Sequence, residues 1–240
     1  MPLPEYRLHM EESFSALESM YTIYASATAD FPVACREKCS DCCTCNVTLT
    51  SLEAAYLLTR LDDAGRRELK RCLEKAPAGQ RFRPKMTTNG FAKACMEGRE
   101  VEDEENDPAW GYCPLLLDGR CTVYPVRPFG CRNMMSETAC AEAGYARMPP
   151  LALTLNNIFL QYIEQLDIGG FTGNLADVLG CYLDRAEKGE GAYLSLENIK
   201  DSGTTGIFIR NHRIPALMIP PDHRTAAAPV LNEIAKIPQG

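Results

Sequence analysis

The sequence predicts a mainly α-helical protein built around a cysteine-rich, loop-dominated core that contains a short β-hairpin. Three observations lead to this fold class. Apolar residues recur at helical spacing in the N-terminal and C-terminal parts of the chain. Eight of the twelve cysteines fall into two tight runs between residues 35 and 140. Within the second run, Asp118-Gly119 separates two short apolar stretches, as is typical of a hairpin turn.

The composition of the whole chain limits its class. With 240 residues, 45% of them apolar, it can form a single compact unit with a sizeable core. A net charge of −7 argues against a nucleic-acid surface, which would be basic. Residues 1–30 carry no apolar targeting core, and no stretch reaches the ~18–20 apolar residues of a membrane span. We therefore expect a cytoplasmic protein without membrane or nucleic-acid partners; a protein partner and the oligomeric state stay open.

Three helices are expected before the second cysteine run. Phe14, Leu17, Met20, Tyr21 and Tyr24 recur at helical spacing and predict a helix over residues 11–29. A second helix begins at Thr50, with Glu53 completing a capping box, and a third covers residues 63–75. The acidic stretch 97–107 is expected to be an exposed loop, because it lacks the spacing and central glycine of a calcium-binding loop.

After Cys140 the chain returns to helical patterns. Apolar stripes predict helices over residues 151–166 and 175–183, which we expect to pack antiparallel across the Gly169-Gly170 break. A short strand is expected around Ile207–Ile209. A last helix is expected over residues 222–236, with Asp222 as its cap.

The two cysteine runs carry the chemistry of the sequence. Thiolates two and three residues apart can converge on one ion or cluster, because a tight turn brings both sulfurs to one point. The candidate metal ligands are Cys35, Cys39, Cys42, Cys43, Cys113, Cys121, Cys131 and Cys140. The fold class is therefore mainly α with a cysteine-rich, loop-dominated metal-binding core containing a short β-hairpin. We divide the chain into an N-terminal helix (1–33), a cysteine-rich metal-binding region (34–140) and a helical C-terminal region packed on it (141–240).

The donor set limits the metal. Cysteines in a reducing compartment favour metal ligation over disulfides, and a chain of this length needs no disulfide framework. His9, His212 and His223 lie far from both runs, so the site is all sulfur, which favours iron–sulfur or zinc over magnesium, calcium or copper(II). An iron–sulfur cluster is our first choice, with a redox or accessory role. Structural or chelating zinc is the alternative, since the spacing of the cysteines suits an iron–sulfur cluster and a zinc ion alike.

Adjacent Cys42 and Cys43 bear on the number of centres. Neighbouring side chains in extended backbone point to opposite faces, so the two thiols can serve two centres more easily than one. Eight thiols make two four-ligand sites, or one cluster with spare thiols. In either case we expect at least one sulfur of each run to share a centre. We also expect the loop-rich segment 31–140 to need the metal for folding.

The remaining cysteines and one further spacing pattern have other interpretations. Cys72 and Cys181 lie in helical patterns and are expected in the core, whereas Cys45 is the most plausible additional ligand. The spacing Cys35-x₃-Cys39-x₂-Cys42 also occurs in radical S-adenosylmethionine enzymes. That assignment is disfavoured because the chain lacks the strand–helix alternation of a β/α barrel and because it leaves the second run without a role.

Residues 35–140 resemble the YkgJ-type cysteine cluster family. The resemblance rests on the order C-x₃-C-x₂-C-C, C-P-x-L, C-x₂-Y, R-P-x₂-C-R and a final cysteine, and includes Tyr124, Arg127, Pro128 and Arg132. It implies a zinc- or iron-chelating domain related to flagellin lysine N-methylases. A protein lysine methyltransferase is thus a third hypothesis, although no glycine-rich strand–turn–helix offers a cosubstrate pocket.

The two arginines of this pattern have a physical interpretation as well. Arg127 and Arg132 could donate hydrogen bonds to thiolate ligands, because a tetrathiolate site is anionic. The alternative is an ordinary surface salt bridge for each guanidinium.

Overall fold

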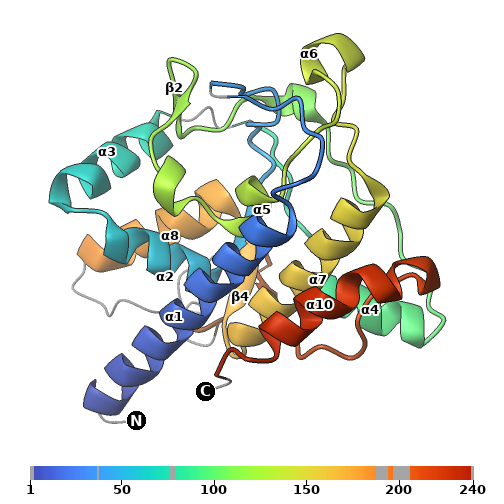
Figure 1. Ribbon diagram of the computed structural model, residues 1–240. Coiled ribbons are helices and arrows are strands. Elements are labelled where there is room, and N and C mark those ends of the chain that lie inside the picture. The colour runs from blue at the N-terminus through green and yellow to red at the C-terminus, as the bar shows by residue number, and fades with distance from the viewer. Residues whose placement is uncertain (1–2, 37, 76–78, 188–193, 197–205, 239–240) are drawn as a thin grey trace.

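A computed structural model describes residues 3–36, 38–75, 79–187, 194–196 and 206–238 (Figure 1). About half of the described chain is helical, and a small antiparallel sheet accompanies the helices. The α-helices of these ranges are α1 (Leu3–Ala27), α2 (Ser51–Arg60), α3 (Asp63–Glu74), α4 (Thr88–Met96), α5 (Phe129–Arg132), α6 (Cys140–Ala143), α7 (Pro150–Leu166), α8 (Leu175–Glu187) and α10 (Arg224–Ile234). Single 3₁₀ turns lie at η1 (Pro108–Trp110), η2 (Tyr124–Val126) and η4 (Pro221–His223). The mainly α-helical prediction is confirmed.

Local signals fix the helices of the N-terminal half. The capping box at α2 is formed as predicted, with the Thr50 hydroxyl and the Glu53 carboxylate each accepting a backbone N–H of the other residue. The Asp62 side chain caps α3, whose bounds match the predicted helix. By contrast, α1 begins eight residues before the expected residue 11, at Leu3.

A three-stranded antiparallel sheet joins distant parts of the sequence. Its order is β1 (Thr48–Thr50), β4 (Phe171–Asn174) and β5 (Ile209–Arg210). Gly173 is opposite Leu49, and a Cβ at Gly173 would lie 2.6 Å from the ring of Phe208, so only glycine fits there. The strand expected near residue 209 is confirmed, whereas β1 and β4 were not predicted.

The expected antiparallel packing of the two C-terminal helices was wrong. Helix α7 packs mainly against α1 and α4, whereas α8 packs mainly against α2, α3 and β4 (Figure 1). The physical reason is β4, which lies in the segment between the two helices, pairs with β1 and packs against α8. Two apolar clusters result, one around Phe159 and Ile163 of α7 and one around Val178 and Leu179 of α8.

The C-terminal helix also differs from expectation at its start. Helix α10 lies along α1 (Figure 1), and Ala227 and Ile234 are fully buried. Asp222 does not cap this helix, because it lies inside η4, and His223 occupies the cap position without a side-chain capping bond. Within the described ranges, no helix combines the length and apolar character that a membrane crossing requires.

Candidate functional site

The two cysteine runs lie side by side in the fold. The Cys113 amide donates to the Cys43 carbonyl at 2.9 Å, and the Cys45 amide donates to the Gly111 carbonyl at 2.9 Å. Between these bonds, Thr44 and Tyr112 form an isolated antiparallel bridge. Backbone hydrogen bonds therefore hold the first run against the start of the second without any metal.

The predicted hairpin places Cys121 next to this contact. Asp118 and Gly119 have φ of 50° and 72°, as a two-residue turn of this type requires, and they join β2 (Leu116–Leu117) to β3 (Arg120–Cys121). Leu116 pairs with Cys121 across the hairpin. The prediction of a hairpin at Asp118-Gly119 is confirmed, and it fixes the position of Cys121 relative to Cys113.

Helix α5 positions Cys131, and buried Glu53 anchors that helix. The amide of Phe129, the first residue of α5, donates to Glu53 Oε1 at 2.7 Å, and the Tyr21 hydroxyl donates to the same oxygen at 2.9 Å. Gly130 permits close approach to β1, because a Cβ there would lie 2.8 Å from the Thr48 carbonyl oxygen. The capping box signalled only a helix start at Glu53, so sequence reasoning missed this second role.

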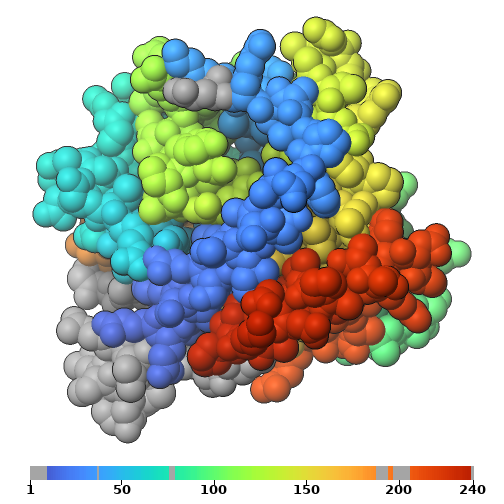
Figure 2. Space-filling model, in the orientation of Figure 1, coloured from blue at the N-terminus to red at the C-terminus, as the bar shows by residue number. Residues whose placement is uncertain are grey.

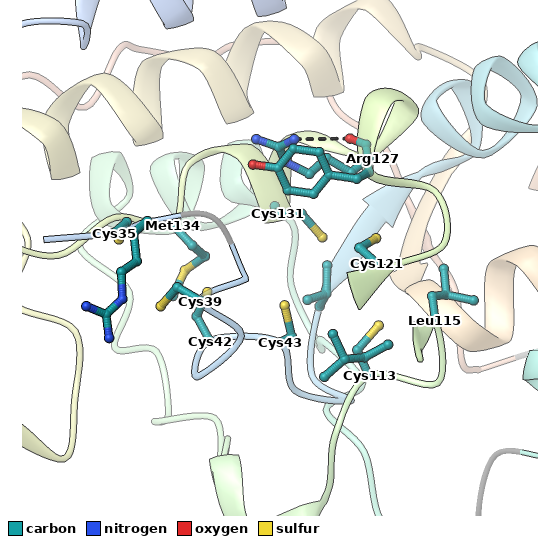
Figure 3. A pocket seen from close by; sticks show the side chains of 15 residues that line it. Cys35, Cys39, Cys42, Cys43, Cys113, Leu115, Cys121, Arg127, Cys131 and Met134 are labelled. Carbon is teal, nitrogen blue, oxygen red and sulfur yellow. Dashed lines mark hydrogen bonds between the residues drawn. The ribbon is translucent and has the colours of Figure 1, made fainter. Parts of the chain in front are cut away.

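Seven of the eight candidate ligands line one cavity of about 130 Å³ (Figure 3). These thiols belong to Cys35, Cys39, Cys42, Cys43, Cys113, Cys121 and Cys131. Figure 2 shows a hollow in this part of the surface, between the first run and the hairpin segment. The Met134 thioether also lines the cavity, and the sequence analysis did not single it out. The donor set is dominated by sulfur, which suits zinc or iron–sulfur centres.

Cys140, the eighth candidate, lies outside this cavity but next to it. It begins α6 and lines a neighbouring groove together with Cys42. A backbone hydrogen bond also joins the two segments near Cys140, because the Ala34 amide donates to the Ser136 carbonyl at 2.7 Å.

The thiols surround the cavity and do not converge on one point. Among the residues that the structure describes, no three cysteine, histidine, aspartate or glutamate side chains form a group arranged to hold a metal ion. The predicted sharing of a centre between the runs therefore stays a prediction, although the backbone brings both runs to one cavity.

Burial keeps the deeper thiols protonated in the absence of a cation. Burial raises the pKa of Cys113 to about 11 from an ordinary 9.0, and it raises the pKa of Cys131 further. Negative charge on neighbouring cysteines adds to the increase at both positions. A cation that binds these sulfurs must displace their protons, so binding strengthens as pH rises.

The thiols of adjacent Cys42 and Cys43 interact with each other. The interaction lowers the pKa of Cys43 and raises that of Cys42, so Cys43 is the acceptor in its ionised form. Cys43 is consequently the thiol of this pair that becomes a thiolate first.

The two predicted arginine partners take different positions. Arg127 lines the cavity, donates to the Tyr124 carbonyl at 3.0 Å (dashed in Figure 3) and lies 3.8 Å from the Tyr124 ring centroid. Its charge lowers the pKa of Cys121 and Cys131, against the larger effect of burial. Arg132 instead donates to the carbonyls of Arg127 and Pro125. Arg127 thus acts on the thiols through its charge, whereas Arg132 holds the loop before α5.

A basic groove adjoins the cavity. Arg36, Lys38 and Arg120 line it together with Cys39 and Cys43, and among the residues that the structure describes no carboxylate side chain lines it. Lys38 has φ of 68°, an uncommon conformation for a non-glycine residue. In a chain with net charge −7, this arrangement favours negative charge at the thiol cavity.

The other four cysteines lie in different surroundings, none of them in the lining of the thiol cavity. Cys72 is buried in the apolar cluster around α8, which confirms the core prediction for that residue, whereas Cys181 is only partly buried and packs against the cluster. Cys45, the expected additional ligand, does not line the thiol cavity; its sulfur lies 3.7 Å from the Gln80 carbonyl oxygen. Cys95 is exposed on α4.

Comparisons of the chain with protein-family models, curated proteins and solved structures found no match.

Proposed function

We propose that the thiol cavity of this protein binds an iron–sulfur cluster, or clusters, and that the protein has a redox or accessory role. One observation carries the proposal: seven thiols line an open space of about 130 Å³ without converging on a single-ion position. A tetrahedral zinc site has Zn–S bonds of ~2.3 Å, so its four sulfurs lie only ~4 Å apart and enclose no such space. A cluster is larger than one ion and still takes cysteine ligands alone.

The surroundings of the cavity support an all-thiolate centre. His212 lies near Gly90 of α4, and His223 Nδ1 forms a 2.7 Å hydrogen bond with the Thr154 hydroxyl of α7, so neither imidazole borders the cavity. All twelve cysteines are free, which suits the proposed reducing, cytoplasmic setting. The resemblance of residues 35–140 to the YkgJ-type family points to metal chelation as well.

When bound, an iron–sulfur cluster supplies one-electron redox chemistry. The chain's own residues set the conditions for it. Leu115 and Val47 give the cavity apolar walls, and Arg127 with the basic groove offsets the negative charge of a thiolate-bound centre. Burial and nearby charge are the two means by which a protein adjusts the potential of such a centre.

Anaerobic purification followed by iron, sulfide and zinc analysis tests the proposal. We expect brown protein that contains iron and acid-labile sulfide in equal amounts, with a Mössbauer spectrum of thiolate-ligated iron. Cys43→Ser should lower the iron content at least two-fold, whereas Cys95→Ser, on the exposed face of α4, should leave it unchanged. Colourless protein with stoichiometric zinc would show that the zinc alternative is right, and metal-free folded protein would exclude both.

A further inference from the structure

Four of the thiols form an inner group that surrounds one end of the cavity. Figure 3 shows the sulfurs of Cys43, Cys113, Cys121 and Cys131 facing a common space. Three contacts position them. The hydrogen bond from the Cys113 amide to the Cys43 carbonyl places Cys43 and Cys113 together, the Leu116–Cys121 hairpin pair places Cys121, and the Glu53 carboxylate, which accepts the Phe129 amide, places Cys131.

The lining of the two neighbouring spaces agrees with that grouping. Cys43, Cys113, Cys121 and Cys131 all line the thiol cavity, and none of these four lines the groove that Cys42 shares with Cys140.

The other four candidates form an outer group. Cys42 and Cys140 line the same groove, and the Ala34–Ser136 hydrogen bond holds the start of the first run against the segment that leads to Cys140. Figure 3 shows Cys35, Cys39 and Cys42 together at the other end of the cavity from Cys113 and Cys121.

We infer that the eight thiols hold two metal centres, one bound by Cys43, Cys113, Cys121 and Cys131 and the other by Cys35, Cys39, Cys42 and Cys140. The inference rests on the proposed function and adds the number of centres and the ligands of each. Cys42 and Cys43 are the point of contact, because they are adjacent in the chain while each belongs to a different group.

The two centres differ in their access to solvent. Cys35 and Cys39 are exposed, whereas all four inner thiols are half-buried. The outer centre should therefore lose its metal first on exposure to air or chelator. The centres also lie within roughly 15 Å of each other, since adjacent Cα atoms are ~3.8 Å apart and each side chain with its ligand bond adds ~5 Å.

Paired alanine variants test the assignment, because the loss of two ligands removes a centre. Cys35→Ala/Cys140→Ala should retain about half of the wild-type iron, and Cys121→Ala/Cys131→Ala should retain at most the other half. In the reduced wild type, electron paramagnetic resonance should show two interacting spins. The Cys35→Ala/Cys140→Ala variant should show an isolated spin. Cys95→Ser, on the exposed face of α4, serves as the control, with iron content and spin coupling unchanged.

The outcomes separate this inference from the proposed function. Full iron content in Cys35→Ala/Cys140→Ala would show that the outer thiols hold no centre, and complete loss of iron in that variant would show one shared centre. Either result overturns the two-centre assignment while an iron-containing wild type preserves the proposed function. Protease resistance of the segment that carries the remaining thiols, together with that of α7, shows that each variant is folded. If the inner variant does not fold, the outer variant and the wild-type spin coupling still decide the question.

Discussion

The thiol side and the helical side of this molecule are held together by different means. Around the cavity, the elements are two-residue strands, single 3₁₀ turns and four-residue helices, connected by backbone hydrogen bonds and single anchors. On the helical side, α1 and α7 have 25 and 17 residues and bury Leu17, Ile158, Phe159 and Ile163 almost completely. Short elements bury little apolar surface, so we expect the thiol side to depend on bound metal, whereas packing holds the helical side together.

Metal removal should have the largest effect, and only on one side. If a chelator strips the reduced protein under anaerobic conditions, residues 34–47 and 113–140 should lose protection against amide hydrogen exchange. Structural metal can supply ~10–16 kcal/mol of apparent binding energy, more than any single packing contact. Peptides from α7 should keep most of their protection. Equal loss of protection on the thiol side and the helical side would show that the two sides do not differ in their dependence on metal.

A substitution that creates a cavity on the helical side should lower the stability of the protein without loss of metal. Ile163 of α7 is 1% exposed, and Ile163→Ala should lower the free energy of unfolding by about 2–5 kcal/mol. The milder Ile163→Val, which removes a single methylene, should cost about 0.5–1.5 kcal/mol. Both are measured by denaturant unfolding of metal-loaded protein, and metal per folded chain should not change. A loss of metal in Ile163→Val would mean that the two sides are more tightly coupled than the structure indicates.

Glu53 links the two sides, so its substitution should affect both. Its carboxylate accepts hydrogen bonds from the Tyr21 hydroxyl and from the amides of Thr50 and Phe129. Glu53→Gln leaves at least one of these buried donors unsatisfied and should cost about 2–3 kcal/mol. Because Phe129 begins the helix that carries Cys131, metal should also dissociate faster. Glu74→Gln, at an exposed position of α3, should change stability by less than about 0.5 kcal/mol.

Two glycines should respond in opposite ways to substitution by alanine, with smaller effects on stability. Both lie in helices, where alanine ordinarily gains roughly 0.5–1 kcal/mol over glycine. At Gly180 of α8 a new Cβ would meet no heavy atom within 4 Å, so Gly180→Ala should be stabilising. At Gly130 of α5 the Cβ would lie 2.8 Å from the Thr48 carbonyl oxygen, and Gly130→Ala should cost about 1–3 kcal/mol. Thermal unfolding of the two variants should show shifts of opposite sign; equal shifts would show that α5 can move away from β1.

The predictable parts of this fold are those whose signal is local. The Thr50–Glu53 cap, the Asp118-Gly119 turn and the cysteine runs each lie within a few residues, and each was recognised from the sequence. The pairing of Thr48 with Asn174 was not, because a three-residue strand has no periodicity and its partner is more than 120 residues away. The same holds for the bond between Glu53 and Phe129 and for Met134 at the cavity. Such contacts depend on the folded chain, and the wrongly expected pairing of α7 with α8 failed for that reason.

A pH titration of metal-free protein should give the smallest effect, again on the thiol side alone. Burial raises the pKa of Cys113 to about 11, whereas in the unfolded chain it has its ordinary value of 9.0. The folded state favours the neutral thiol, so this stabilisation is complete below pH 9 and is lost as pH rises toward 11. For this one group the loss of stability at pH 10 is about 1 kcal/mol.

Hydrogen exchange at pH 8 and pH 10, corrected for the intrinsic rate, should show this loss of stability in residues 111–124, while the protection of α7 stays unchanged. Cys113→Ser, which has no thiol to titrate, should reduce the pH dependence. Metal-loaded protein should not weaken over this range, because binding requires the thiolate. A metal-free wild type whose hairpin region is equally stable at both pH values would contradict the burial of Cys113.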